Sequence, residues 1–308
     1  MKKNLPKGYN LKAKSCDHKF LDYVTKYEND GLKIHSVFNR VINLIDANGN
    51  LITIANNELD NGPATLIVDS KINFNFINQE MEVKYYDQKI TIADKLQISL
   101  ADLKIWTVPA AKIDKVNSIY FKKNKNLFDS YLKSKLTTDG CGYFYLANFH
   151  SDKKFEQSSG MISKELNLRL SNLKAKLIAG EDITAEIKSI IGFGIGLTPS
   201  GDDFLVGMLS VFYLLKEGEK LFLEIVSILK KFKIETTDIS KKMLKYSIRG
   251  STRENIYKLI NALTAEEKIK EKVIKNVLEI GSTSGKDIAV GIMTAFDVII
   301  NIRENNGG

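Results

Sequence analysis

The chain is poor in cysteine, the residue that is frequent in disulfide-rich secreted proteins and in structural zinc sites. Its 308 residues include only two cysteines, Cys16 and Cys141, which lie far apart and have no neighbours at metal-ligand spacing. Neither a disulfide framework nor a zinc site is expected, and a reducing compartment fits this composition. Four prolines and a hydrophobic fraction of 44% are ordinary for a globular protein.

Long apolar segments are also missing. The longest apolar run, residues 204–215, has about a dozen residues, whereas a membrane-spanning helix needs about 20. This run therefore predicts a buried core helix. The basic stretch at residues 1–10 is not followed by an apolar segment of signal-peptide length. We expect a soluble, cytoplasmic protein with no membrane partner.

Arginine is scarce, although the formal net charge is +8. Lysine supplies most of the positive charge and is spread among Asn and Ile, as in the stretch 122–135, which we interpret as a solvated surface. Phosphate clamps and base-reading proteins favour the bidentate guanidinium fork. Nucleic acid is therefore not the expected partner. Binding of RNA through lysines, the remaining alternative, would depend steeply on salt.

The first half of the chain predicts short strands. Between residue 34 and residue 109, β-branched and aromatic residues are interrupted by turn dipeptides such as Asn48-Gly49, which should close a hairpin over residues 41–54. Further strands are predicted at residues 64–68, 72–77, 82–86, 89–92 and 104–108. We expect an antiparallel β-rich barrel or sandwich within residues 1–150, with Trp106 in its core.

The second half predicts helices. Lys- and Asn-rich residues 116–136 are interpreted as the connection between the halves, and after Gln157 the apolar residues recur with a period of about 3.6. Residues 151–308 should therefore form a mainly α-helical domain, in which Phe204 is a core residue. The expected fold class is α+β.

The helical half contains a pseudo-repeated helix start with the sequence Ser-Gly-x-Asp, followed four residues later by glycine. The two copies are Ser200, Gly201, Asp203 and Gly207, and Ser284, Gly285, Asp287 and Gly291. Each copy runs into an apolar helix, and a glycine precedes each serine, at Gly196 and Gly281.

The simplest interpretation of the repeat is structural. Ser-x-x-Asp is a capping box, which stabilises a helix by about 1 kcal/mol. The preceding glycine would end the previous segment in a left-handed conformation, and Asp202 would add favourable charge at the helix start. In that case the chain would be a non-catalytic assembly or regulatory subunit.

A functional interpretation explains more of the pattern. Gly207 and Gly291 fall in the second helical turn, where glycine costs about 1 kcal/mol relative to alanine, so a neighbouring helix or a ligand should approach closely. Successive N–H groups at a glycine-rich helix start form a site for phosphate or carboxylate. Neither turn matches a P-loop or a dinucleotide fingerprint.

This interpretation assigns roles to particular side chains. The catalytic candidates are Asp202, Asp203 and Asp287, of which Asp202 and Asp203 are the candidate ligands for Mg²⁺. The candidates for binding an anionic substrate are Gly196, Thr198, Ser200, Gly201, Thr237, Thr283, Ser284, Gly285, Lys286 and His35. Thr237 is also suited to cap the helix that starts near Asp238. His35 would reach the turns only if the two halves pack closely, and otherwise is a structural histidine.

At these residues the chain resembles the AllH-like family. The longest match is Gly-Leu-Thr-Pro-Ser-Gly-Asp-Asp-Phe-Leu-Val-Gly at residues 196–207, and weaker matches lie at residues 236–240 and 283–291. The β-rich half is similar at residues 35–39 and at Gly62-Pro63, so the resemblance covers nearly the whole chain. Ser282 departs from the pattern, because relatives carry His there, and no proton-transfer role is carried over to it.

The resemblance implies a subunit of an oxamate carbamoyltransferase of purine and allantoin nitrogen metabolism. Such a subunit works with an FdrA-like protein and a further subunit in the phosphorolysis of oxalurate to oxamate and carbamoyl phosphate, so phosphate would be the co-substrate. Family members occur in other contexts as well, and the acyl substrate need not be oxalurate. Substrate identity, metal dependence and homo-oligomer formation stay open at this point.

Overall fold

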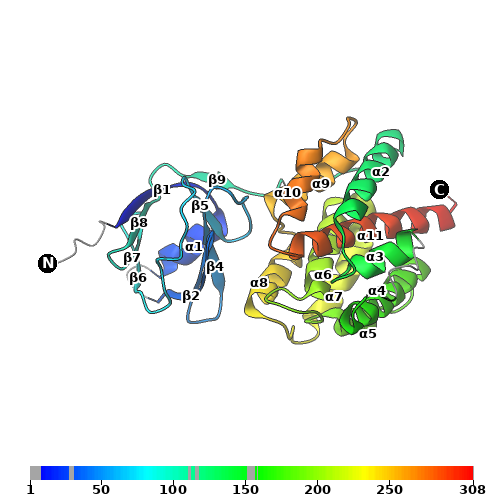
Figure 1. Ribbon diagram of the computed structural model, residues 1–308, viewed down its shortest axis with the longest axis horizontal. Coiled ribbons are helices and arrows are strands. Elements are labelled where there is room, and N and C mark those ends of the chain that lie inside the picture. The colour runs from blue at the N-terminus through cyan, green and yellow to red at the C-terminus, as the bar shows by residue number, and fades with distance from the viewer. Residues whose placement is uncertain are drawn as a thin grey trace. The chain divides into compact units, whose positions relative to one another are not determined.

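The computed structural model describes residues 8–27, 31–109, 112–114, 118–150, 157 and 159–307. It divides into two compact units, residues 1–109 and 110–308, each of which is visible in Figure 1. The division comes before the position expected at residue 150. Residues 1–7 of the basic N-terminal stretch, and residues 116 and 117 of the expected connection, lie outside the described residues.

The early division has a clear structural reason. Most of the stretch expected to connect the halves is helix α2 (Ser118–Lys135), and the next apolar segment is helix α3 (Gly142–His150). Helix α2 packs on helices near the C-terminus, and α3 packs on the helix that follows it. The apolar side chains Phe121, Phe128 and Leu132 of α2 are buried at helical spacing. The prediction of a connection here was wrong, and the α+β fold class is confirmed.

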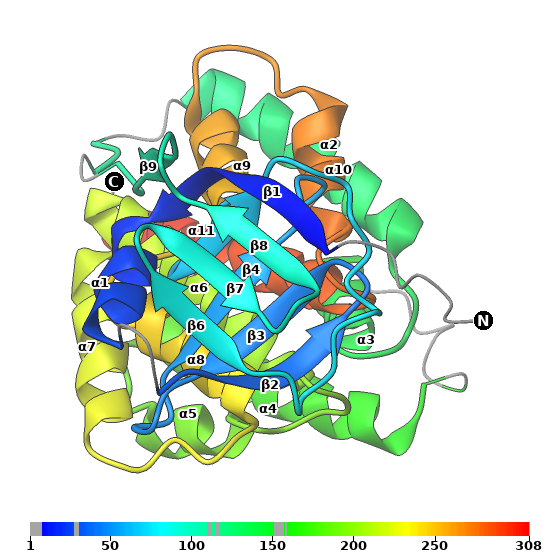
Figure 2. The same ribbon diagram turned by 90° about the vertical axis from the view of Figure 1, so that its left-hand side faces the viewer.

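The first unit is a nearly closed, barrel-like sheet with one helix. Its elements are β1 (Tyr9–Asp17), α1 (His18–Lys26), β2 (Lys33–Phe38), β3 (Val41–Ile45), β4 (Leu51–Ala55), β5 (Thr65–Val68), β6 (Val83–Tyr86), β7 (Lys89–Ile92), β8 (Leu96–Ser99) and β9 (Lys104–Trp106). The strands follow the order β2-β3-β4-β5-β1-β8-β7-β6, and β9 pairs with β1. Figure 2 shows β1, β8, β7 and β6 side by side.

The sheet is mixed, not purely antiparallel as expected. The predicted hairpin at residues 41–54 is present as β3 and β4, and β6, β7 and β8 form an antiparallel meander. However, β1 runs parallel to β8 and to β9, and β4 runs parallel to β5. The register of β1 shifts between Ala13 and Ser15. The N-terminal part of β1 pairs with β8, and its C-terminal part pairs with β9.

One predicted strand is absent, and one expected core residue is only half-buried. Residues 72–77 form no strand, although Phe74 and Ile77 are buried. The Phe74 N–H donates to the Asn39 carbonyl at 3.0 Å, so this segment packs as an apolar loop against the sheet. Trp106 on β9 is half-buried, because β9 continues only three residues along the end of β1.

The second unit is helical, as predicted. Beyond α2 and α3 it contains α4 (Met161–Ala179), α5 (Thr184–Ile190), α6 (Ser200–Leu214), the 3-10 turn η2 (Lys216–Gly218), α7 (Glu219–Lys230), α8 (Asp238–Ser247), α9 (Glu254–Thr264), α10 (Glu271–Leu278) and α11 (Ser284–Asn305). Helix α6 contains residues 204–214 of the run predicted to be a core helix, and Phe204 is fully buried. Among the described helices, none is both long and apolar enough to cross a membrane.

The centre of this unit is the pair α6 and α11, which pack closely along their length (Figure 1). A Cβ atom on Gly207 would lie 2.1 Å from the carbonyl oxygen of Ile288 on α11. A Cβ atom on Gly291 would lie 2.1 Å from the carbonyl oxygen of Phe204 on α6. The close approach expected at these glycines is therefore made by the neighbouring helix.

Candidate functional site at two helix starts

The two Ser-Gly-x-Asp turns meet in space. Helix α6 begins at Ser200 and α11 begins at Ser284. The hydroxyl oxygens of Thr198 and Ser284 are 2.7 Å apart and share a hydrogen bond between residues 86 positions apart in the chain. The helices that cross at Gly207 and Gly291 therefore also bring their first turns together.

The predicted capping boxes are not formed. Each serine is the first residue of its helix, and the capping positions are Pro199 and Thr283, neither of which makes a side-chain cap hydrogen bond within the described part of the chain. The backbone carbonyls of Pro199 and Thr283 instead accept the N–H groups of the first helical turns. The serine hydroxyls are thus left for other partners.

The glycine N–H groups do not form the open anion site that we expected. The Gly201 N–H donates to the Phe193 carbonyl at 2.9 Å, and the Gly285 N–H donates to the Ile280 carbonyl at 2.8 Å. A Cβ atom on either glycine would lie within 2.1 Å of a backbone carbonyl oxygen. These glycines pack helix starts against the preceding segments, and their N–H groups are not available to a ligand.

The serine of each turn is hydrogen-bonded to the aspartate of the other turn. The Asp203 carboxyl on α6 is hydrogen-bonded by Ser284 and Thr198, whereas the Asp287 carboxyl on α11 is hydrogen-bonded by Ser200. Asp287 Oδ1 also accepts the Cys141 N–H at 2.7 Å. Each turn therefore supplies a hydroxyl to the carboxyl group of the other.

Burial gives the two carboxyl groups unusual proton affinities. Asp203 and Asp287 are both 3% exposed. Burial, and then the charge of Asp287, raise the pKa of Asp203 to about 8 against the hydrogen bonds that it receives. Burial raises the pKa of Asp287 to about 6, opposed by the Cys141 N–H, by Ser200 and by the charge of Lys286. At neutral pH Asp203 holds a proton and Asp287 is mostly ionised.

Both carboxyl groups keep an unused oxygen. Within the described residues, Oδ2 of Asp203 and Oδ2 of Asp287 are buried and have no hydrogen-bond partner. Buried polar atoms are rarely left unpaired, because an unmade hydrogen bond costs about 1–3 kcal/mol. These two atoms are therefore the places where a proton or a ligand group would be stabilised.

Asp202 faces away from this pair. Its Oδ1 accepts the Gly192 N–H at 2.8 Å, and its Oδ2 accepts the Thr236 hydroxyl. It thus ties the glycine-rich loop and the start of α8 to α6, and burial raises its pKa. Because neighbouring helical residues point in different directions, Asp202 and Asp203 do not converge on one ligand. They do not fit the Mg²⁺ site that we expected, and nowhere in the described chain do three His, Cys, Asp or Glu side chains form a metal-ligand group.

The remaining predicted residues are placed as follows. Thr237 caps α8, accepting the Ser240 N–H at 3.2 Å, and its hydroxyl donates to the Leu197 carbonyl. Gly196 and Thr283 are exposed on the two turns, and Lys286 is half-buried beside them. His35 lies on β2 of the first unit, with Nδ1 3.1 Å from the Ser36 hydroxyl.

Sequence reasoning missed the segment that closes this site from a third side. Gly140 has φ +54°, and a Cβ atom there would lie 2.5 Å from Asp287 Oδ1 and 2.9 Å from the Ser200 hydroxyl oxygen. The positive φ and the lack of space both require glycine. The Gly140-Cys141-Gly142 triplet was the available signal. Burial, followed by the Asp287 charge, raises the pKa of Cys141, so its thiol stays protonated.

Two family models match the chain. The model described as oxamate carbamoyltransferase subunit AllH matches residues 190–296, which include both Ser-Gly-x-Asp turns. The model described as AllH family N-terminal domain matches residues 12–105, which make up most of the first unit. No solved structure matches the chain. The chain belongs to the AllH family.

Proposed function

We propose that this chain is a subunit of a carbamoyltransferase that transfers a carbamoyl group between phosphate and a small anionic acyl compound of the oxamate type. The family description supports the reaction class. The observation that carries the site is the buried pair Asp203 and Asp287, which holds one proton at neutral pH. One oxygen of each group has no hydrogen-bond partner in the described part of the chain.

The pair suits the proton balance of this reaction. In phosphorolysis, a phosphate oxygen attacks the carbamoyl carbon of oxalurate, the bond from that carbon to the oxamate nitrogen breaks, and the nitrogen takes up a proton. A carboxyl group with a pKa of about 8 is protonated and ready to supply that proton near neutral pH. In the reverse direction the Asp203 carboxylate accepts the proton from the attacking nitrogen.

Side chains, in place of the Gly201 and Gly285 amides, would hold the anion. The N–H groups of Gly201 and Gly285 are used within the fold. The neutral Asp203 carboxyl and the ammonium of Lys286 remain as donors for a carboxylate or phosphate. The exposed Thr283 lies at the same turn. Phosphate is the expected co-substrate.

Partner subunits would complete this site. Ile195 and Leu197, on the loop before α6, are 75% and 56% exposed although both are large and apolar. Exposed apolar side chains at the rim of a polar site favour contact with another protein. We propose that an FdrA-like subunit and a further subunit of the same enzyme cover this loop.

The proposal is tested on the complex purified with its co-purifying subunits. Carbamoyl phosphate formation from oxalurate and phosphate is measured for wild type and for Asp203→Asn. General acid catalysis typically contributes about 10²–10⁴-fold, so Asp203→Asn should lose at least about 100-fold in kcat. Asp102→Asn, at an exposed residue of the first unit, is the control and should keep full activity. Unchanged turnover of Asp203→Asn in an intact complex would remove Asp203 from the reaction.

A second candidate function is supported by the interlocked packing of α6 and α11. The chain would then be a non-catalytic assembly or regulatory subunit whose turns only fix these two helices. Phosphate, carbamoyl phosphate and oxamate titrated against the isolated chain separate the two functions, because a ligand raises Tm only if it binds the folded state. A rise in Tm that is lost in Ser284→Ala supports the transferase site, whereas no rise with any of the three supports the assembly role.

A further inference from the structure

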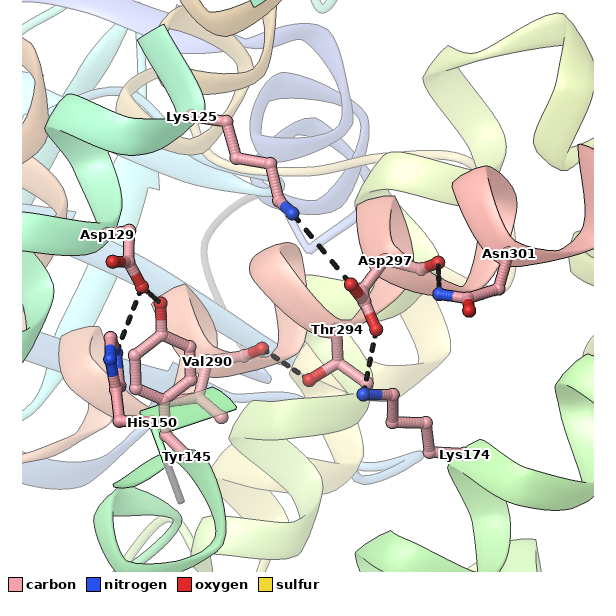
Figure 3. Close-up of polar contacts among 9 residues, drawn as sticks. All are labelled: Lys125, Asp129, Tyr145, His150, Lys174, Val290, Thr294, Asp297 and Asn301. Carbon is pink, nitrogen blue, oxygen red and sulfur yellow. Dashed lines mark hydrogen bonds and ion pairs between the residues drawn. The ribbon is translucent and has the colours of Figure 1, made fainter. Parts of the chain in front are cut away.

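A second polar site lies in the helical unit, between α2, α3, α4 and α11. It is a pocket of about 310 Å³, lined in part by Lys125, Asp129, Lys174 and Asp297. Figure 3 shows the side chains of these four residues together with neighbouring residues that include Tyr145 and His150. Small-molecule sites usually enclose about 300–1,000 Å³, so this polar pocket is large enough for a compound of a few heavy atoms. The sequence predicted only a solvated lysine surface here.

The cationic side of the polar pocket is held by one aspartate. Lys174 Nζ lies 2.7 Å from Asp297 Oδ2, and it sits over the Phe149 ring at 4.3 Å from the ring centre. Lys125 Nζ approaches Asp297 Oδ1 only to 3.8 Å, which is beyond hydrogen-bond distance. Among the described residues, Lys125 makes no other polar contact. Lys125 lines the pocket, and its ammonium points toward Asp297 (Figure 3).

The anionic side of the polar pocket is Asp129, one helical turn beyond Lys125 on α2. Its Oδ1 accepts the Tyr145 hydroxyl at 2.5 Å and lies 3.1 Å from His150 Nε2. Burial, and then the Asp129 hydrogen bond, raise the pKa of Tyr145, so this hydroxyl stays a donor. Oδ2 of Asp129 has no bond to any described residue.

Lys125 and Asp129 would normally pair with each other. Opposite charges at i and i+4 lie on the same helix face, with Cβ atoms about 5–6 Å apart, and commonly form an ion pair. Here each charge is held by another helix, Lys125 near Asp297 on α11 and Asp129 against Tyr145 on α3. A cation and an anion, each with bonding capacity that no described residue uses, therefore line the same cavity from one helix.

We propose that the polar pocket binds a small zwitterion of the α-amino-acid type. The ligand carboxylate meets the ammonium groups of Lys125 and Lys174, and the ligand ammonium meets Asp129 Oδ2. The two lysines and the two aspartates of the lining balance in charge, so a simple anion or a simple cation would leave one half of the site unpaired. A zwitterion satisfies both halves.

The polar pocket is separate from the Ser-Gly turns. Asp297 stands ten positions after Asp287 on α11, which corresponds to about 15 Å along the helix axis. The contacts that form the pocket involve none of Ser200, Asp203, Ser284 or Asp287. The two sites thus share no contact residue.

The experiment is a thermal-shift and calorimetric screen of the whole chain against the twenty protein amino acids at millimolar concentration, with acetate and ethylamine as single-charge probes. At least one amino acid should raise Tm, while acetate and ethylamine should not. Lys125→Met should weaken that binding at least 10-fold, because it removes the ammonium whose N–H groups are unused. Lys125→Arg should restore part of the affinity.

The matched control is Lys123→Met, which changes an exposed lysine of the same helix that faces away from the polar pocket. It should bind like wild type. Asp129→Asn keeps the shape and should also lose affinity for the amino acid. Three results would overturn the proposal: no amino acid binds, acetate or ethylamine binds as well as any amino acid, or binding survives unchanged in both Lys125→Met and Asp129→Asn.

Discussion

Gly207 on α6 and Gly291 on α11 each lie against the backbone of the opposite helix, and they do so in the same way. A Cβ atom on either residue would lie 2.1 Å from a carbonyl oxygen of the other helix. Each glycine stands seven positions after the serine that begins its helix. Both copies of the sequence repeat therefore make the same kind of packing contact, from a glycine to the backbone of the other helix. This contact sets the position of both Ser-Gly-x-Asp turns.

Alanine at either glycine should destabilise the fold. A backbone carbonyl 2.1 Å from the added Cβ cannot move without displacing a helix, so the loss should be about 1–3 kcal/mol or more, despite the gain in helix propensity of about 1 kcal/mol. Urea unfolding of Gly207→Ala and Gly291→Ala measures it. Gly160→Ala, at an open position with φ −69°, is the control and should stay near wild type. Equal stability of all three variants would contradict this close packing.

The hydrogen bond between Thr198 and Ser284 should couple the two turns. Its oxygens are 2.7 Å apart and part-buried, and a hydrogen bond of this kind contributes about 0.5–1.5 kcal/mol. A double-mutant cycle with Thr198→Val and Ser284→Ala should give an interaction energy in that range. In the control cycle, Thr198→Val is combined with Ser282→Ala, at an exposed neighbour, and the two effects should add. Additive effects in the first cycle would mean that the turns are not joined in solution.

The general outline of the fold was predictable from local patterns. Alternation of apolar residues and the Asn48-Gly49 dipeptide gave the hairpin of β3 and β4, and apolar periodicity gave the helices after residue 160. The parallel pairings of β1 were not predictable, because strand order depends on contacts between segments far apart in sequence. Helix α2 was not predicted, because its many lysines favoured a solvated connection. The helical spacing of the buried residues Phe121, Phe128 and Leu132 was overlooked.

The site was predictable in its members but not in its contacts. The repeat identified Ser200, Asp203, Ser284 and Asp287, all of which converge. The exchange of serine and aspartate between the turns follows from the crossing of α6 and α11, and no local rule states it. The assignment of Asp202 to the same site did not hold, because adjacent positions on a helix face different neighbours.

The stability of the protein should fall as pH rises from about 4 to about 8. The folded-state pKa values of Asp203 and Asp287, about 8 and about 6, lie above the ordinary value of 3.8. The folded state therefore binds more protons than the unfolded state above about pH 4. The contribution of each group to stability is fully present below that pH. It is lost as the pH rises to about 6 for Asp287 and to about 8 for Asp203. Each group contributes a slope of at most about 1.4 kcal/mol per pH unit.

Urea unfolding of wild type and Asp203→Asn across this pH range measures the slope. Asparagine does not ionise, so the variant should lose the decline between pH 6 and pH 8. Asp102→Asn, at an exposed residue, should keep the wild-type slope. The burial of Asp203 would be contradicted if Asp203→Asn and wild type declined in parallel.

The activity of the assembled transferase should follow a bell-shaped pH profile. With Asp203 as proton donor, the alkaline limb should fall near pH 8. We propose that Asp287 must be ionised, because its charge helps to keep the proton on Asp203, and this should place the acidic limb near pH 6. Because the carboxyl groups interact, these limbs are properties of the pair. The Asp287 charge is one of the causes that raise the pKa of Asp203. Asp287→Asn should therefore abolish the acidic limb and move the alkaline limb to lower pH, whereas a profile that keeps both limbs in place would exclude coupled proton transfer by these two residues.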